Sequence, residues 1–204
     1  PAVTPPRPPR TIADHGVIGN LATMALVAND GAIDFLCWPD FDSPSVFAAL
    51  LDPERGGHFT LAPEIENARV VQTYVPDTNV LLTHWMGDEV GAEITDLMSG
   101  PEELGHGAPR LLRRVRVLRG SVRFNLDCQP RLDYARKQPQ VEIGDGQAVF
   151  SAPGAPRLRL SAPVGFSVHE GGVRACFELH AGQVLDVVLD EDGDDLPDQQ
   201  GRDE

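Results

Sequence analysis

The sequence predicts an all-β fold, arranged as one antiparallel β-sandwich. Short runs that alternate apolar and polar residues recur along most of the chain, and turn signals such as Asn29-Asp30-Gly31 and Gly144-Asp145-Gly146 separate them. Only one stretch, beginning at Ser43, carries the signals of a helix. Short strands at regular spacing with almost no helix are typical of a sandwich or a barrel, and we favour the sandwich.

The chain divides into a body and two compositionally distinct ends. Residues 1–11 are rich in proline, with five prolines in the first ten residues, and predict an extended arm. Residues 12–189 form the predicted single sandwich domain, and a hydrophobic content of 41% is enough for its core. Residues 190–204 hold eight acidic residues and one arginine, so we expect a disordered tail or the start of a linker.

The first hairpin and the segment after it are the most informative part of the body. Strands are predicted at Met24–Ala28 and Ile33–Trp38, because Asn29-Asp30-Gly31 between them tolerates the positive φ of a tight turn. Ser43 is a helix N-cap residue, and Pro44 suits the first helical position. We therefore predict one short helix of about two turns after the first hairpin. Its apolar face would consist of Val46, Phe47, Leu50 and Leu51.

The rest of the body predicts strands joined by turns and by a few longer loops. These strands are expected at His58–Leu61, Ala68–Tyr74, Asn79–Met86, Ala92–Leu97, Arg110–Arg119, Val122–Cys128, Val141–Ile143, Ala148–Ser151, Leu158–Ser161, Phe166–His169, Val173–His180 and Val184–Leu189. In Arg110–Arg119, Arg114 and Arg116 alternate with valines, which predicts a sheet with one solvated face. We favour this interpretation over a phosphate-binding stripe, because no interleaved aromatic residues or glycine-rich loop accompany the arginines.

Charge and cysteine usage limit the classes of partner and the compartment. The formal net charge is −14, of which the tail contributes −7, and we expect no nucleic-acid partner. Cys37, Cys128 and Cys176 each lie in an apolar strand-like run and form no CxxC pair, which favours buried free thiols in a reducing compartment. Neither a signal peptide nor a run of membrane-spanning length is visible, so we expect a cytoplasmic protein without a membrane partner.

The sequence provides little for catalysis. The six histidines are scattered singly, and nucleotide-binding, dinucleotide-binding and serine-hydrolase motifs are missing, so we expect neither a metal nor a cofactor. A glycosidase needs only two carboxylates, and Asp40 and Asp42 are candidates by position. We favour structural roles, with Asp42 capping the helix or its loop and Asp40 solvated, because two residues in an extended loop point in different directions and no apolar pocket is indicated. We therefore name no catalytic residue.

Several motifs in sequence order carry a family resemblance. They are Ile18-Gly19, Ala25-Leu26-Val27, Asp30-Gly31-Ala32-Ile33-Asp34-Phe35, Cys37-Trp38-Pro39-Asp40-Phe41-Asp42-Ser43-Pro44, Tyr74-Val75-Pro76-Asp77-Thr78-Asn79-Val80-Leu81, Leu112-Arg113-Arg114-Val115 and Pro130-Arg131-Leu132-Asp133-Tyr134. In this pattern the chain resembles the N-terminal domain of bacterial glucoamylase and trehalase-like enzymes, family 15 of the glycoside hydrolases. Three positions depart from it: Asp40 stands where arginine or asparagine is common, Phe35 replaces a tryptophan, and Ala135 replaces a frequent glycine.

The resemblance implies a supersandwich-like β-sandwich that is a non-catalytic accessory domain. The catalytic glutamates of the family lie in a C-terminal (α/α)6 barrel, which we expect to be absent from this chain and to be its partner. In the whole enzyme, the domain would pack on the barrel and shape the mouth of a site that hydrolyses α-glucosidic bonds with inversion. The residues expected at this interface, next to an α-glucoside substrate, are Trp38, Pro39, Asp40, Phe41, Asp42, Ser43, Arg131, Asp133 and Tyr134.

Two alternatives to the accessory domain remain open at this stage. The chain would be a self-standing carbohydrate-binding module if Trp38, Tyr74, Trp85 and Tyr134 formed a platform for sugar rings. It would be a structural or regulatory protein if the natural polypeptide kept this fold without the barrel. Because a domain without its barrel would expose an apolar surface, we also expect the isolated chain to form a homo-oligomer.

Overall fold

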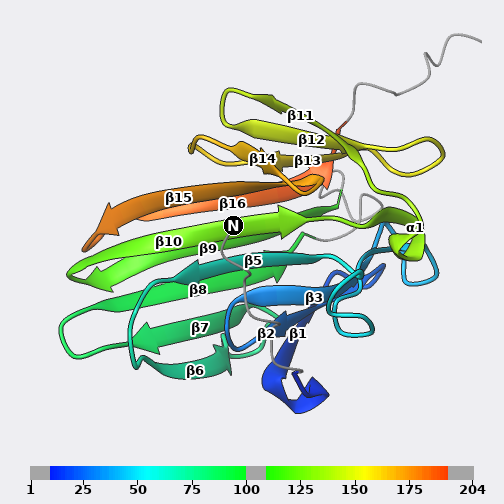
Figure 1. The fold of residues 1–204 in the computed structure, drawn as a ribbon. Coiled ribbons are helices and arrows are strands. Elements are labelled where there is room, and N and C mark those ends of the chain that lie inside the picture. Colours follow the sequence, from blue (N-terminus) through cyan, green and yellow to red (C-terminus); the bar gives the residue numbers. More distant parts are fainter. Residues whose placement is uncertain (1–9, 100–108, 193–204) are drawn as a thin grey trace, which may run out of the picture.

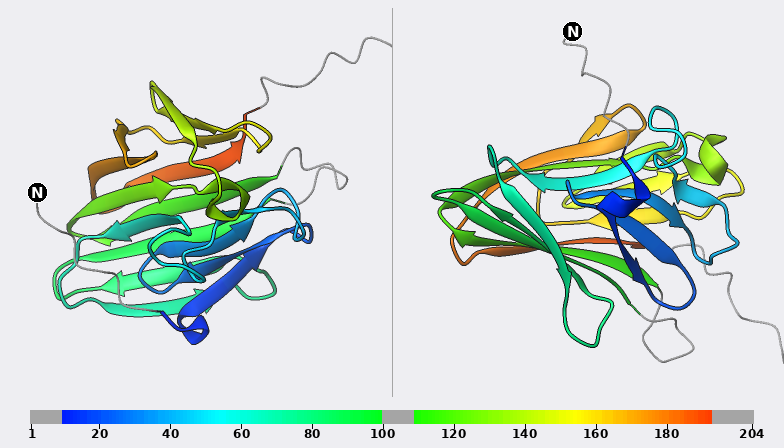
Figure 2. Two further views of the ribbon diagram at one scale, coloured as in Figure 1. Left: turned by 45° about the vertical axis from the view of Figure 1, so that its right-hand side comes forward. Right: turned by 90° about the horizontal axis from the view of Figure 1, so that it is seen from below.

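The computed structural model describes residues 10–99 and 109–192, which form two antiparallel sheets packed face to face. Figures 1 and 2 show the two layers, with both sheets open at their edges. The predicted all-β sandwich is therefore confirmed. In the described part of the chain, no helix is both long enough and apolar enough to cross a membrane.

Each sheet combines strands from both halves of the chain. Sheet A contains, in spatial order, β1 (His15–Gly19), β2 (Met24–Ala28), β3 (Ala32–Cys37), β5 (His58–Pro63), β10 (Ser121–Gln129), β15 (Gly172–His180) and β14 (Ser167–His169), and β4 (Ser45–Phe47) pairs with β3. Sheet B contains β11 (Gln140–Gly144), β12 (Gln147–Ser151), β13 (Leu158–Ser161), β16 (Val184–Glu191), β9 (Arg110–Arg119), β8 (Gly91–Met98), β7 (Leu81–Met86) and β6 (Arg69–Tyr74). Two short helical turns, η1 (Ile12–Asp14) and α1 (Leu132–Ala135), complete the described elements.

The predicted helix after the first hairpin is wrong. Ser45–Phe47 forms the short strand β4, which pairs with β3 through Leu36 and Phe47. Phe47 is fully buried in this position, so an apolar residue that would occupy one face of a helix instead packs into the sandwich. A strand gains ladder hydrogen bonds to β3 and core burial together, which outweighs the local helix signal of Ser43 and Pro44.

The predicted domain ends need one correction. Strand β16 continues to Glu191, two residues past the expected end of the body at residue 189. Asp190 is buried and pairs with Arg159, so it belongs to the sandwich and not to a disordered tail. At the N-terminus, only Arg10 and Thr11 of the predicted arm lie within the described residues, and the remainder of the predicted tail, 193–204, lies outside them.

The prediction that all three cysteines are buried is also wrong. Cys37 and Cys128 are buried free thiols, and burial raises the pKa of each. Cys176 is a free thiol on β15 but is exposed, because its side chain has the outward parity of that strand. Alternation along a strand places successive side chains on opposite faces, so an apolar neighbourhood in the sequence does not itself determine burial.

One charged residue crosses the core and joins the two sheets. Arg113 on β9 is fully buried, and its Nε donates a hydrogen bond of 2.7 Å to Oδ1 of the equally buried Asp96 on β8. Its two terminal nitrogens donate to the backbone carbonyls of Phe59 and Gly31, each at 2.9 Å. Phe59 belongs to β5 in the opposite sheet, and its ring centroid lies 4.9 Å from the Arg113 Cζ. This arginine therefore satisfies acceptors from both layers.

Asp127, on the outer side of β10, provides a pH-dependent contribution to stability. Burial raises the pKa of its carboxyl, but His58, Gln129 and Arg174 together outweigh that effect and lower the pKa from 3.8 to about 2. The contribution is present above the unfolded pKa of 3.8 and is lost as the pH falls through about 2. We expect Asp127→Asn to reduce the free energy of unfolding by roughly 2 kcal/mol at pH 7, measured by urea unfolding.

The difference between Asp127→Asn and the unsubstituted protein should shrink as the pH falls. Both proteins carry a neutral side chain at position 127 below pH 2, so their free energies of unfolding should converge there. Asp186→Asn is a suitable control, since the pKa of Asp186 is also lowered, by Arg114, but that ion pair is exposed. A constant difference between Asp127→Asn and the unsubstituted protein from pH 7 to pH 2 would contradict this assignment.

Candidate functional site

The loop after β3 is held in a defined conformation by the turn between β1 and β2. The peptide bond between Trp38 and Pro39 is cis. The backbone N–H of Phe41 donates to the carbonyl of Ala22 at 2.9 Å, and the Thr23 hydroxyl donates to the carbonyl of Cys37 at 2.7 Å. The turn between β1 and β2 thus contacts both the end of β3 and the backbone of Phe41 in the loop, although the Phe41 side chain is 57% exposed.

A second loop reaches the same end of the sandwich, and its backbone is strained. Asp133, Tyr134 and Ala135 in α1 have φ values of 54°, 55° and 62°, so three successive non-glycine residues are left-handed. Each such residue costs about 1–2 kcal/mol relative to a right-handed conformation. Reciprocal backbone hydrogen bonds of 3.0 Å between Leu132 and Lys137 close the loop. Strain of this kind persists where the surrounding structure enforces it, frequently at functional sites.

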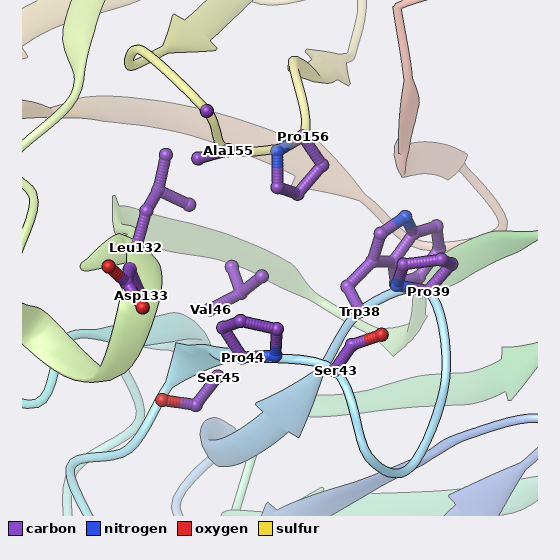
Figure 3. Close-up of a pocket in the computed structure, with 11 residues that line it drawn as sticks. Trp38, Pro39, Ser43, Pro44, Ser45, Val46, Leu132, Asp133, Ala155 and Pro156 are labelled. Atoms are coloured by element: carbon purple, nitrogen blue, oxygen red, sulfur yellow. The ribbon is translucent and has the colours of Figure 1, made fainter.

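The two loops meet at a pocket of about 280 Å³. The first loop and β4 contribute Trp38, Pro39, Ser43, Pro44, Ser45 and Val46, α1 contributes Leu132 and Asp133, and the β12–β13 connection contributes Gly154, Ala155 and Pro156. Figure 3 shows the apolar side chains from these three segments facing one another across the opening, while the Ser45 hydroxyl points away from it. The direct hydrogen bond from the Arg131 backbone N–H to the Val46 carbonyl, at 2.9 Å, joins the second loop to β4.

The charged groups around the pocket are paired with one another. The Asp133 carboxylate lies 3.5 Å from Lys137 Nζ and 3.8 Å from Arg136 Nη1, and Lys137 also donates to the Gly154 carbonyl at 3.1 Å. On the Trp38 side of the pocket, the buried indole N–H of Trp38 donates to Oε1 of Glu191 at 3.0 Å. Glu191 is the last residue of β16. The pocket therefore has apolar walls, a compensated carboxylate and no second carboxylate among its lining residues.

The structure brings together only part of the predicted interface. Trp38, Pro39, Ser43 and Asp133 line the pocket, while Asp40, Phe41, Asp42 and Tyr134 are exposed and are not among its lining residues. Arg131 is directed elsewhere: its guanidinium donates to the carbonyls of Pro130 and Glu170 and to Gln129 Oε1, and burial lowers its pKa. It therefore holds the loop against the β14–β15 turn.

The aromatic platform that would characterise a carbohydrate-binding module does not form. Trp38 and Trp85 are 1% and 5% exposed and belong to the core. The Tyr74 hydroxyl contacts the Val17 backbone at the edge of β1, accepting from its N–H at 2.8 Å and donating to its carbonyl at 2.9 Å. Of the four aromatics, only Tyr134 is exposed at the pocket end, with Arg136 stacked 5.7 Å from its ring.

Sequence reasoning missed the third segment of the pocket. Gly154, Ala155 and Pro156 lie between two short strands far along the chain from the first loop, where the sequence predicts only a connection. The signal in the sequence was the run Ala152-Pro153-Gly154-Ala155-Pro156, in which two prolines restrict a loop of small residues. Local sequence cannot say which other loop such a segment meets, because that depends on strand order.

Ala135 offers a direct test of backbone strain in the second loop. We expect Ala135→Gly to raise the free energy of unfolding by up to about 1 kcal/mol, because glycine adopts a φ of 62° without a steric penalty. Urea unfolding measures the change. Ala181→Gly, at an exposed turn residue without a positive φ, is the matched control and should lower stability. Equal losses at both positions would contradict the left-handed conformation of Ala135.

The pocket lining is mainly apolar and contains one carboxylate, that of Asp133. Acid and base catalysis of glycoside hydrolysis needs two carboxylates with different environments, and Asp133 is a single, ion-paired carboxylate. Within residues 10–99 and 109–192, no three histidine, cysteine or acidic side chains gather closely enough to hold a metal ion.

Comparisons with known proteins relate the chain to one family. The sequence profile described as "Trehalase-like, N-terminal" matches residues 7–194. The chain is 31% identical to a trehalase of Mycolicibacterium smegmatis over 93% of the chain and 31% of that protein. It is 34% identical to a trehalase of Thermoplasma volcanium over 67% of the chain and 22% of that protein, and 30% identical to a trehalase of Mycobacterium tuberculosis over 90% and 30%. The chain thus spans less than a third of the length of these relatives.

Proposed function

The chain belongs to the family of trehalase-like N-terminal domains, and from this premise we propose that it is the non-catalytic accessory domain of a family 15 glycoside hydrolase. The whole enzyme would hydrolyse an α-glucosidic bond with inversion, using catalytic groups in a C-terminal (α/α)6 barrel. The domain would pack against that barrel and shape the mouth of its active site. A cytoplasmic location is part of this proposal, because all three cysteines are free thiols.

The observation that carries the proposal is the convergence of two loops on the pocket at one end of the sandwich. Phe41 and Tyr134 are 57% and 50% exposed there, although both lie in loops whose backbones are firmly held. Rigid loops that present exposed aromatic side chains are suited to contact another domain, since little conformational freedom is lost on binding. The relatives are trehalases more than three times as long as their matched segment, which supports a catalytic region outside this domain.

The experiment is steady-state kinetics on the longer polypeptide that carries this domain, with trehalose and maltooligosaccharides as substrates. We expect Phe41→Ala and Tyr134→Ala each to lower kcat/KM by about tenfold, the effect of losing roughly 1.4 kcal/mol at an interface anchor. Val168→Ala is the matched control, because Val168 is 53% exposed on β14 and lies outside both loops. Its kcat/KM should not change.

Two results would contradict the proposal. One is unchanged kcat/KM in both aromatic variants, which would separate these loops from the active-site mouth. The other is release of glucose by the 204-residue chain alone, at a rate that follows the protein through purification. Calorimetry of the chain with trehalose and maltose tests the carbohydrate-binding alternative, which predicts saturable binding that Tyr134→Ala weakens.

A further inference from the structure

The outer face of sheet B carries an apolar stripe that the loops and the pocket do not include. Core residues of β9 and β16, such as Leu111 and Leu189, point inward, so the alternate residues of these strands point outward. Leu97, Leu112 and Val188 have this outward parity and lie directly opposite one another across β8, β9 and β16. Each is partly exposed. Three adjacent strands therefore present one continuous apolar band to the outside.

Ion pairs border the stripe on both sides along the strands. On one side, Asp186 lies two residues before Val188 and directly opposite Arg114. The Arg114 Nε and Nη2 donate to the two Asp186 carboxylate oxygens at 2.6 and 2.8 Å. On the other side, Asp190 pairs with Arg159 at 3.1 Å and with Arg110 at 3.5 Å. An apolar centre with a charged, internally paired rim is the usual composition of a protein–protein contact surface. A solvated sheet face would more commonly carry polar side chains at these central positions.

No helix of the described part of the chain covers this face. Its regular elements outside the two sheets are η1, which precedes β1, and α1, which contacts β4, and both of these strands belong to sheet A. Burial of these three apolar side chains against a partner would remove apolar surface from water, which is favourable. The sandwich by itself does not bury this stripe, so a partner that covered it would gain this favourable contribution.

We propose that the stripe formed by Leu97, Leu112 and Val188 is a docking surface for the catalytic region that follows this domain, which rests on the proposed function. Val188 lies only three residues before Glu191, where β16 ends, so a polypeptide continuing from β16 begins at the edge of the stripe. The curated relatives continue well beyond their matched segment. A second copy of the chain is the less favoured occupant, because two chains of net charge −14 repel each other.

The test compares two valines on one strand. Val188→Lys places a charge in the stripe, whereas Val184→Lys places the same charge on the same outward face four residues earlier, opposite Arg116. In the longer polypeptide, we expect Val188→Lys to lower the thermal midpoint of the first unfolding transition by roughly 4 °C or more and Val184→Lys to leave it nearly unchanged. In the 204-residue chain, both variants should keep thermal midpoints within roughly 2 °C of each other, because both positions lie outside the core.

Each other outcome overturns the proposal. Equal small shifts for both variants in the longer polypeptide would mean that nothing docks on the stripe. A selective loss of stability for Val188→Lys in the 204-residue chain itself would make Val188 a structural residue. Light scattering could also show that the longer polypeptide is a dimer and that Val188→Lys dissociates it. That result would identify a second copy as the occupant of the stripe. If the stripe fails while Phe41→Ala and Tyr134→Ala still lower kcat/KM, the accessory function stands without this surface.

Discussion

Arg113→Ala is expected to lower the free energy of unfolding by about 3–5 kcal/mol, because it leaves the carboxylate of Asp96 buried without a counter-charge. The Phe59 and Gly31 carbonyls lose their donors in the same substitution. A domain of this size is stable by roughly 5–15 kcal/mol, so the loss is a large share of the total. Urea unfolding followed by far-UV circular dichroism measures it.

The neighbouring arginine provides the matched control. Arg114 lies on the same strand and pairs with Asp186, but both side chains are substantially exposed, at 51% and 40%. An exposed ion pair contributes about 0–1 kcal/mol, so Arg114→Ala should have a small effect. The double variant Arg113→Met with Asp96→Leu should recover part of the loss, since no charge is then buried alone. Similar losses for Arg113→Ala and Arg114→Ala would refute a special role for the buried pair.

Trp38→Ala should cost about 3–5 kcal/mol, as expected for removal of a large, fully buried aromatic side chain. The same substitution removes the donor to Glu191 and one wall of the pocket. We therefore expect the thermal midpoint to fall by roughly 6 °C or more, measured by differential scanning calorimetry.

Two milder substitutions separate packing from hydrogen bonding at this position. Trp38→Phe keeps much of the ring but loses the indole N–H, and a hydrogen bond to a charged acceptor contributes about 1.5–3 kcal/mol. Glu191→Gln retains an acceptor and should cost less than Trp38→Phe. A loss below about 1 kcal/mol for Trp38→Ala would show that the loop after β3 does not depend on this side chain.

Most strands can be predicted from the local alternation of apolar and polar residues. Features that this alternation does not predict depend on how the strands pair. Arg110–Arg119 was predicted with its bounds intact, because valines and arginines alternate there with a period of two. The same alternation marks Arg113 as an exception, since it has the inward parity of Leu111 and Val115. Its inward position becomes stable only through Asp96 and two carbonyls, which the fold brings from distant parts of the chain.

The errors in the prediction have a similar cause. Ser43 and Pro44 carry the local signals of a helix start, but the pairing of the following Ser45–Phe47 with β3 is a tertiary effect that propensity does not contain. The strand His15–Gly19 escaped prediction because it is short and carries two glycines, which strands usually disfavour. For the candidate site, the family resemblance identified the two loops, but their meeting with the segment 154–156 depends on the order of strands in both sheets.

The central position of β16 has a consequence for synthesis on the ribosome. This last described strand lies between β13 and β9, so without it sheet B would fall into two separate parts, β11 to β13 and β9 to β6. Neither part can be joined to the other until residues 184–191 have left the exit tunnel. Long-range antiparallel pairing of this kind forms slowly, and the partly folded chain exposes unpaired strand edges until the pairing is complete. The nascent chain therefore presents two open edges, on β13 and β9, until β16 arrives, and this interval is when a holding chaperone would protect it most.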